Sequence, residues 1–283
     1  MKNTLHIQLE ERPNDEDLIY DGIEQDGQRY GIAPATEVAA FIYDDAGQIC
    51  GGAYGDLGWD YLYTDILWVS AAHRGQGNGR HSLNALERAA LQRGIDKAYL
   101  ATTSFQSLQF YYHQGYRLFG VLEDRPPGHR YYYLHKTMTN TDTNDLPPVI
   151  ENPARDSLRV LAQGLSQYNR QQGAQSGSQR LTVTLRDDDG HLCGGLTGAT
   201  YWGWLDIQAM WIDTPWRGRG YGKALLAEAE AESLRRGVVQ AVIDVATFQS
   251  LGFFQRHEYT TFATLAGRPA GQTTHFLRKA LKA

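Results

Sequence analysis

The stretch HRGQGNGRHSLN, residues 73–84, places three glycines at alternate positions between two arginines, where a helical pattern begins. Glycine tolerates positive φ and lets a backbone approach a ligand closely. The first amides of a helix have no partners within the helix, and its dipole adds partial positive charge there. The segment therefore predicts a turn that presents backbone amides and arginine charge to a phosphate-like anion.

The same pattern returns in WRGRGYGKALL, residues 216–226, as part of a long internal repeat. DDAGQICGGAYG (44–55) matches DDDGHLCGGLTG (187–198), and the same shift matches TSFQSLQFYYHQGY (103–116) to ATFQSLGFFQRHEY (246–259). The match runs without a gap from Asp44 to Met138, much longer than a solenoid repeat. We therefore predict two copies of one domain, repeat one (1–140) and repeat two (147–283). The polar, proline-containing stretch 137–152 is predicted to be a linker.

Composition limits the class of protein. The chain has 283 residues with 42% hydrophobic content, enough for two domains with their own cores. A net charge of −5 argues against nucleic acid or an anionic membrane as the main partner. The sequence has no long apolar run and no secretory pattern at its start, so we expect a cytoplasmic protein. Cys50 and Cys193 occupy equivalent positions of the two repeats, and we expect two buried thiols and no metal site.

Hydrophobic periodicity predicts the elements of repeat one. Helices are predicted at 15–25, 80–93 and 105–115, and strands at 37–45, 48–55, 59–70, 95–103, 116–124 and 130–138. Strands 59–70 and 95–103 flank a crossover helix, so these two are expected to be parallel. The fold class is α/β or α+β, with a mixed sheet in each repeat.

The spacing of the glycine loop distinguishes between phosphate-binding motifs. It lacks the Gly-Lys-Ser/Thr ending of a P-loop and the spacing of the dinucleotide fingerprint. Its R-x-x-G-x-G spacing resembles the pyrophosphate loop of the Gcn5-related N-acetyltransferases (GNAT), which bind acetyl-coenzyme A. The long strand before the loop resembles that family's fourth strand, and SLQFYYHQGY (107–116) resembles its A-x-x-F-Y-x-x-x-G-F/Y segment. This resemblance covers both repeats and implies two tandem GNAT folds, each mostly antiparallel with one splayed parallel strand pair.

The resemblance implies an acetyl-CoA site in each repeat. In repeat one, main-chain groups near Trp68 and Val69 would bind the pantetheine arm and the acetyl carbonyl, and Ser104 lies where a cofactor-contacting Asn often occurs. The loop residues are Arg74, Gly75, Gln76, Gly77, Asn78, Gly79 and Arg80. The matching residues of repeat two are Ile212, Arg217, Gly218, Arg219, Gly220, Tyr221, Gly222 and Lys223.

The resemblance also places Tyr111 at the position of the family's general-acid tyrosine. A phenol with a pKa near ~10 is protonated at neutral pH and suits donation to a departing thiolate. The alternative is that this ring only packs helix against sheet. Repeat two has Phe254 there, which keeps the ring and loses the proton. We therefore expect repeat one to be active, and repeat two to bind coenzyme A while being catalytically degenerate.

The base and the acceptor site are less closely tied to the family pattern. Histone-type members carry a glutamate at the position of Tyr63, which is Asp206 in repeat two. Asp65, two residues after Tyr63 on the same strand face, is our candidate base, with a purely structural role as the alternative. The segment LEDRPPGHRYYYL (122–134) would lie over the acceptor. Its candidate contacts to the amine, together with Tyr63, are Glu123, Asp124 and His129.

These residues predict an acetyl-CoA-dependent N-acetyltransferase that acts through repeat one on the primary amine of a small molecule. Three alternatives remain open: a non-catalytic acyl-CoA-binding or regulatory protein, and an acetyltransferase of either a protein amine or an aminoglycoside-like antibiotic. We also expect the two repeats to pack as an intramolecular pseudo-dimer.

Overall fold

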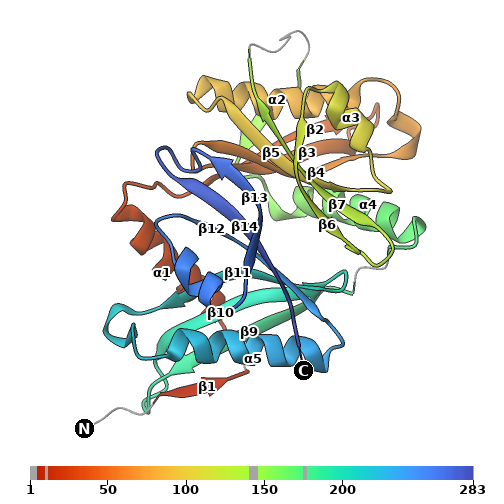
Figure 1. Cartoon of the computed structure of the whole chain (residues 1–283). Helices are drawn as coiled ribbons and strands as arrows, with labels where there is room; N and C mark the ends of the chain where they lie inside the picture. Colours follow the sequence, from red (N-terminus) through yellow and green to blue (C-terminus); the bar gives the residue numbers. More distant parts are fainter. Residues whose placement is uncertain (1–4, 10–11, 140–145, 175–176, 283) are drawn as a thin grey trace. The chain divides into compact units, whose positions relative to one another are not determined.

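The computed structural model describes residues 5–9, 12–139, 146–174 and 177–282 (Figure 1). The chain forms two compact units. The first unit, which contains most of repeat one, comprises Pro34–Ser176 and Leu265–Thr273. The second unit comprises Met1–Ala33, Gly177–Thr264 and Thr274–Ala283. Each unit is built on one seven-stranded mixed sheet, which confirms the predicted fold class.

The sheet of the first unit has the strand order β8-β2-β3-β4-β5-β7-β6. In this order, its strands are β8 (Val149–Glu151), β2 (Thr36–Tyr43), β3 (Ile49–Gly58), β4 (Tyr61–Val69), β5 (Lys97–Thr103), β7 (Arg130–Thr137) and β6 (Arg117–Glu123). Strands β4 and β5 are parallel, and the other neighbours are antiparallel. The predicted parallel pair is therefore confirmed.

Two helices cover opposite faces of this sheet. Leu83 of α2 packs with Leu62 and Leu100 on one face, and Leu161 of α4 packs with Phe41 on the other. The remaining helical segments are a short turn before α2 and a short helix after β5. The bounds are η1 (Ala71–His73), α2 (Asn78–Gln92), α3 (Leu108–His113) and α4 (Arg155–Gln171). The two faces therefore have separate cores, and the face that carries α4 holds the candidate acceptor groups described below.

The second unit repeats this architecture with the strand order β1-β9-β10-β11-β12-β14-β13. Strands β11 and β12 form its parallel pair. In strand order, the bounds are β1 (His6–Gln8), β9 (Gln179–Arg186), β10 (Leu192–Tyr201), β11 (Trp204–Ile212), β12 (Gln240–Ala246), β14 (Thr273–Ala280) and β13 (Thr260–Ala266). Its helical segments are α1 (Asp15–Gln28), η2 (Thr214–Trp216), α5 (Tyr221–Arg235) and α6 (Leu251–Arg256).

Each unit contains the opening strand and helix of the other repeat. Strand β1 pairs with β9, and α1 packs on β10 and β11. In the same way β8 pairs with β2, and α4 packs on β3 and β4. The expected boundary between 140 and 147 separates the repeats along the chain, but the compact units are assembled across it. Of the predicted linker 137–152, residues 140–145 lie outside the described residues, and 149–151 form β8.

Helices α4 and α1, which each pack on the sheet of the other repeat, contact that sheet through a glycine and a tryptophan. A Cβ atom on Gly164 of α4 would lie 2.2 Å from the indole of Trp68 on β4. A Cβ atom on Gly22 of α1 would lie 2.3 Å from the indole of Trp211 on β11. Real Cβ contacts are never so short, so only glycine lets either helix backbone come this close to its sheet. Both sheets therefore receive their helix through the same contact.

A β-bulge interrupts β4 at Asp65. Thr64 pairs with Gly55 and Ile66 pairs with Tyr54, so Asp65 is the extra residue of the bulge. A Cβ atom on Gly55 would lie 2.0 Å from the carbonyl oxygen of Tyr63, so the bulge requires glycine at this point of β3. The regular alternation expected over 59–70 is therefore broken at the candidate base, because a bulge turns its side chain relative to the strand.

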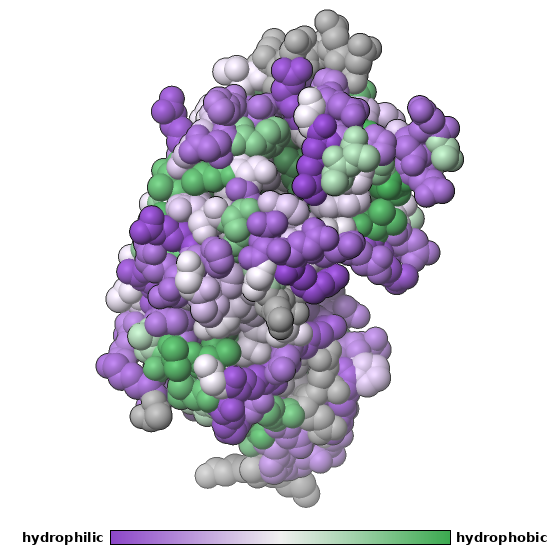
Figure 2. Space-filling model, turned by 90° about the vertical axis from the view of Figure 1, so that its right-hand side faces the viewer, coloured by the Kyte–Doolittle hydropathy of each residue, from purple (hydrophilic) through white to green (hydrophobic). Residues whose placement is uncertain are grey.

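The buried thiols expected at the two cysteines are confirmed. Cys50 and Cys193 are both buried free thiols. No helix in the described ranges combines the length and the apolar character needed to cross a bilayer. Figure 2 shows one face of the molecule, where hydrophilic side chains predominate and hydrophobic ones form small separate groups.

Candidate active site

The glycine loop of the first unit leads from η1 into the start of α2. Gly75 and Gly77 have φ of 76° and 86°, the left-handed region that favours glycine. The Arg74 amide donates to Ala71, and the His81 amide donates to Gly77. Among the described residues, the six amides of 75–80 between them have no hydrogen-bond acceptor. A row of free amides at a helix N-terminus fits the diphosphate of coenzyme A.

Side chains of the loop hold this turn in place. The Arg74 Nε donates to the Val69 carbonyl at 2.9 Å, and the Arg74 guanidinium lies 5.0 Å from the ring centroid of Tyr168 on α4. The Asn78 Nδ2 donates to the His73 carbonyl at 2.9 Å. These contacts fix the loop without neutralising Arg74 with a carboxylate, so its positive charge stays beside the free amides. Gln76 and Arg80 are exposed on the same turn.

The parallel strands β4 and β5 separate after a short paired stretch, which leaves an open edge on the side of β4 that faces β5. These strands pair only over Leu62–Thr64 and Ala98–Leu100. The Ser70 amide donates to the Cys50 carbonyl, so Val69 occupies the next, non-hydrogen-bonded position of the β3–β4 ladder. Its amide points to the open edge, where it suits a carbonyl oxygen that develops negative charge.

Trp68 does not share this geometry. It pairs with Gly52 of β3, so its main-chain groups face the ladder, and its indole contacts α4 at Gly164. Of the two residues, Val69 has its amide on the open edge of β4, and cofactor contact by main-chain groups of either residue stays a prediction.

Tyr111 lies on α3 with only 8% of its surface exposed. Its ring makes edge contacts with Phe110 and Tyr116, at centroid distances of 5.2 and 5.9 Å. A Cβ atom on Gly79 would lie 3.8 Å from the Phe110 ring, which brings α3 next to the start of α2. Burial raises the pKa of Tyr111 well above its usual value. The phenol therefore keeps its proton at neutral pH, as a general acid must.

Asp65 and Tyr63 meet at the bulge. The Tyr63 hydroxyl donates to Asp65 Oδ1 at 3.4 Å. The Asp65 side chain keeps contact with solvent, yet many protein atoms surround it. This desolvation raises the pKa of Asp65 above that of an ordinary carboxyl, and the Tyr63 hydrogen bond opposes the rise. A carboxylate of raised pKa is a better proton acceptor, so Asp65 is suited to act as a base.

Three further tyrosines join Tyr63 on the α4 side of the sheet. Tyr63 stacks on Tyr99 of β5 with a centroid distance of 4.7 Å and an interplanar angle of 28°. The rings of Tyr131 and Tyr133 on β7 meet edge to face, with a centroid distance of 5.3 Å. We call these four residues the tyrosine cluster. Sequence analysis missed all but Tyr63, although the alternation in RYYYLHK (130–136) places Tyr131 and Tyr133 on one face of their strand.

Two more carboxylates continue this face towards β2. Asp56 lies directly opposite Tyr63 on β3, and Glu37 lies opposite Asp56 on β2. Burial, together with the neighbouring charges of Asp65 and Glu37, raises the pKa of Asp56 to about 6. Arg155 of α4 opposes this rise and binds Glu37 at 3.0 Å. The face is therefore acidic and aromatic, which suits a cationic amine.

The loop between β6 and β7 holds the other predicted acceptor residues. Glu123 binds Arg130 at 2.9 Å, and Asp124 accepts a hydrogen bond of 3.2 Å from the Gly128 amide. His129 Nδ1 lies 3.1 Å from the hydroxyl of Ser104, which begins the connection after β5. Glu123 and Asp124 therefore stabilise their own loop, whereas Ser104 and His129 are brought together at the end of β5.

The second unit has an equivalent glycine loop but no tyrosine at the position of Tyr111. Gly218 and Gly220 have φ of 74° and 88°, and the amides of 218–223 have no acceptor among the described residues. The Arg217 Nε donates to the Ile212 carbonyl at 2.6 Å, and its guanidinium forms an ion pair with Asp26 of α1. Tyr221, Gly222 and Lys223 form the first turn of α5, and Arg219 lies over the Trp216 ring. Phe254 occupies the place of Tyr111 and is only 4% exposed.

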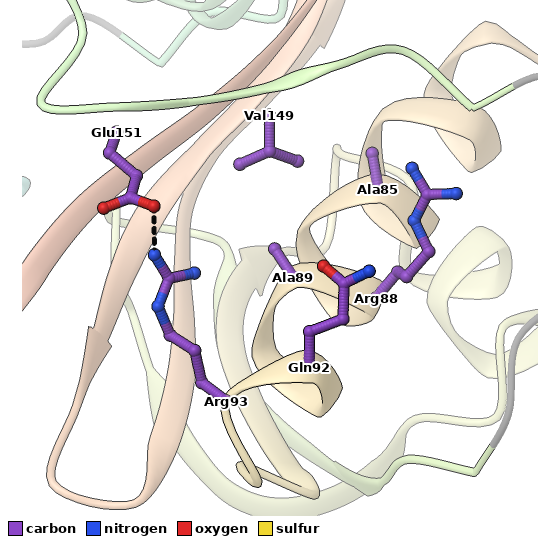
Figure 3. A pocket seen from close by; sticks show the side chains of 7 residues that line it. All are labelled: Ala85, Arg88, Ala89, Gln92, Arg93, Val149 and Glu151. Atoms are coloured by element: carbon purple, nitrogen blue, oxygen red, sulfur yellow. Dashed lines mark hydrogen bonds and ion pairs between the residues drawn. The ribbon is translucent and has the colours of Figure 1, made fainter.

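Two other features lie away from both loops. A cavity of about 180 Å³ lies between the C-terminal half of α2 and β8, where Arg93 and Glu151 form an ion pair (Figure 3). Asp187, Asp189 and His191 place potential metal-ligand atoms within 4.8 Å of one another in the β9–β10 turn. Hydrogen bonds from the Asp189 and His191 amides to Asp187 account for that cluster as part of the turn.

Comparisons with known proteins identify relatives of this chain. The model of the acetyltransferase (GNAT) family matches residues 4–116 and 152–259. "Acetyltransferase Atu2258" of Agrobacterium fabrum is 33% identical over 124 residues, which cover 44% of this chain and 90% of that protein. The blasticidin-S acetyltransferase of Streptomyces morookaense is 39% identical over 93 residues, which cover 32% and 68%. A crystal structure of an acetyltransferase from Bacillus cereus is 30% identical, with a TM-score of 0.43, over 47% of this chain and 97% of that one.

Proposed function

The chain belongs to the GNAT family of acetyltransferases and is itself an acetyltransferase, and from this premise we propose that its first unit acetylates the primary amine of a small cationic molecule. The main support is that, among the described residues, only this unit combines a glycine loop, a buried phenol on the short helix and a carboxylate of raised pKa. The proposed acetyl donor is acetyl-CoA.

The residues of the first unit fit this donor. The amides of 75–80 and the charge of Arg74 would hold its diphosphate, and the Val69 amide would donate to its thioester carbonyl oxygen. When bound, acetyl-CoA supplies the acetyl group as a thioester that an amine can attack directly. The free amides are the observation that supports this fit, because they lack the acceptors that a closed structural turn would provide.

Two side chains would move the protons. A lysine-like amine has a pKa near ~10.4 and must lose a proton before it attacks. Asp65 would accept this proton, directly or through water. Tyr111 would donate its proton to the sulfur as the carbon–sulfur bond breaks. The nitrogen would lose its second proton as the adduct collapses, and this proton would restore the Tyr111 phenol, while Asp65 would release the first proton to solvent. The products are then an N-acetyl amine, a free thiol and one released proton.

The acceptor class follows from the charge of the face around Asp65. Glu37, Asp56 and Asp65 lie beside the tyrosine cluster, and this combination favours a cation with an apolar or planar body. The blasticidin-S acetyltransferase, which matches part of this chain, supports an antibiotic amine as one candidate acceptor. An aminoglycoside-like amine belongs to the same class by charge.

For the second unit we propose binding of coenzyme A without turnover. Its loop keeps the glycines and the free amides, and adds Arg219 and Lys223. Phe254 lacks the proton that Tyr111 supplies, and Asp65 is replaced by Gln208 at the equivalent bulge. Such a unit would sense or store the ligand and leave acetyl transfer to the first unit.

Matched charge reversals test this division of labour. Gln76→Glu and Arg219→Glu change equivalent positions of the two loops, where a carboxylate would repel the diphosphate. With a panel of polyamines, aminoglycosides and blasticidin S, release of free thiol by the intact chain is the readout. We expect Gln76→Glu to raise the KM for acetyl-CoA about tenfold, and Arg219→Glu to leave turnover unchanged. Equal losses in both variants, or no thiol release with any amine, would contradict the proposal.

A further inference from the structure

The connection between β13 and β14 belongs to repeat two in the sequence, but residues 265–273 pack as part of the first unit. Two hydrogen bonds hold it there on the β3–β4 hairpin. The Tyr61 hydroxyl donates to the Ala266 carbonyl at 3.0 Å, and the Ala270 amide donates to Asp60 Oδ2 at 2.7 Å. This connection is therefore anchored on both sides of Arg268.

These anchors place the Arg268 guanidinium over the rings of Tyr99 and Trp59, at 4.7 and 5.3 Å from their centroids. Tyr63 already stacks on one face of Tyr99, so the guanidinium lies on the other face. Tyr63 in turn donates its hydroxyl to Asp65. A continuous series of contacts thus runs from Arg268 through Tyr99 and Tyr63 to the candidate base.

We infer that Arg268 is a positioning residue for acetyl transfer in the first unit, because it clamps Tyr99 and thereby holds Tyr63 against Asp65. Repeat two would thus contribute to catalysis in the first unit without carrying out chemistry of its own. This inference rests on the proposed function. A cation–π contact of this kind is strong enough to favour one orientation of a tyrosine ring.

The expected defect follows from the contacts that link Arg268 to Asp65 through Tyr99 and Tyr63. Without the clamp, Tyr63 is free to leave Asp65, and the hydrogen bond that opposes the raised pKa of Asp65 is lost. The pKa of Asp65 then rises further, and the acid side of the kcat/KM profile moves to higher pH. The other ionisable groups around Asp65 are Tyr54 and Asp56 on β3, and the Glu37–Arg155 pair of β2 and α4. The test therefore compares Arg268→Met with Arg268→Lys, which keeps the cation beside these groups.

Steady-state kinetics of the intact chain test the inference with four variants. Arg268→Met removes the charge, Arg268→Lys keeps a cation, Asp60→Ala loosens the anchor, and the control Arg278→Ala removes an exposed arginine of β14. We expect Arg268→Met to lower kcat about threefold to tenfold, with the KM for acetyl-CoA unchanged and the acid limb moved to higher pH. Arg268→Lys should recover most of kcat, Asp60→Ala should show a milder form of the defect, and Arg278→Ala should match the wild type.

The outcomes separate the two proposals. A wild type that transfers acetyl groups while Arg268→Met keeps its kcat and pH profile would overturn the positioning role alone. A loss of kcat with an unmoved acid limb would also overturn it, because general loosening of the fold predicts that result. A wild type that acetylates no amine would overturn the proposed function, and the positioning role with it. Melting temperatures of the Arg268 and Asp60 variants would identify any that do not fold.

Discussion

The same row of positions crosses both sheets, and its residues differ between the units. In the first unit the row consists of Glu37, Asp56, Tyr63, Tyr99 and His135. In the second unit the paired positions are Arg180, Ala199, Asp206, Val242 and Arg278. One row is acidic and aromatic, whereas the other carries two arginines and a single carboxylate. Duplication therefore kept the backbone of the row and replaced its side chains.

The frameworks of the two units, by contrast, remain alike. A glutamate that is buried or partly buried accepts hydrogen bonds from a tyrosine and a lysine in each: Glu87 from Tyr116 and Lys136, and Glu230 from Tyr259 and Lys279. These groups stay paired because a buried charge that loses its partner destabilises a fold strongly. The glycine loops and the Gly–Trp contacts are also shared. Folding and loop geometry thus constrain both repeats, whereas acceptor chemistry constrains only the first.

The largest expected effect comes from making the first unit resemble the second at Tyr111. Tyr111→Phe removes the proton and keeps the ring, so it should lower kcat by about 10²–10⁴-fold. The KM for acetyl-CoA should change little, because the loop amides are untouched. Tyr112→Phe, at an exposed neighbouring position, is the control and should be silent. Full activity of Tyr111→Phe in a thiol-release assay would remove the chemical distinction between the units.

The second prediction concerns the carboxylate at the bulge. Because desolvation by the surrounding protein atoms raises the pKa of Asp65, although its side chain reaches solvent, its basic form is lost as the pH falls through this raised value. The kcat/KM of the wild type should therefore decline on the acid side. Asp65→Asn should lower kcat/KM about 10–100-fold and flatten that acid limb. Asp206→Asn in the second unit should leave the whole profile unchanged, and an effect equal to that of Asp65→Asn would place chemistry in both units.

The third prediction concerns what the units share. Gly164→Ala and Gly22→Ala each force a methyl group into an indole, so each should destabilise the fold by about 1–3 kcal/mol. Gly177→Ala is the control, since its Cβ would meet no atom within 4 Å. Denaturant unfolding would measure all three variants. If only one of these two variants lost stability, α1 and α4 would not contribute equally to the stability of their units.

The smallest expected effect separates the two loops. Arg217 is paired with Asp26, whereas Arg74 lies over the ring of Tyr168. Asp26→Asn should free the charge of Arg217 and tighten coenzyme A binding by the second unit about twofold to fivefold at low salt. Calorimetry in the Gln76→Glu background, with the first loop weakened, would measure this change. Weaker binding after Asp26→Asn would mean that the ion pair preorganises the loop.

Sequence analysis predicted the main strands and helices of repeat one and the glycine loop because these depend on local patterns. It assigned the helix 15–25 to repeat one, whereas α1 packs on β10 and β11 of the second unit; α4, for which no residues were predicted, packs on β3 and β4 of the first unit. Both contacts set a helix glycine against a strand tryptophan, Gly22 on Trp211 and Gly164 on Trp68, so the two sites share one local pattern. Local pattern therefore does not specify which helix joins which sheet.

The candidate site shows the same limit. Tyr111 and the loop residues follow from motifs that are contiguous in sequence. The stacking of Tyr63 on Tyr99 depends on the parallel register of β4 with β5, and that register is non-local. The bulge at Asp65 also went unpredicted, although Gly55 and Gly198 mark the point on each neighbouring strand where a close approach occurs.

The exchange of opening segments sets an order of events on the ribosome. Strand β1 has its partner in β9, where His6 pairs with Arg186, so it must wait roughly 10–40 s of translation for a neighbour. Strand β8 and helix α4, in contrast, emerge when the sheet they join has already been made. The segment that carries Arg268 is synthesised long after Tyr99 and Trp59, on which it packs. The first unit therefore begins to assemble early, but the contact of Arg268 with these rings forms only after most of repeat two has been made.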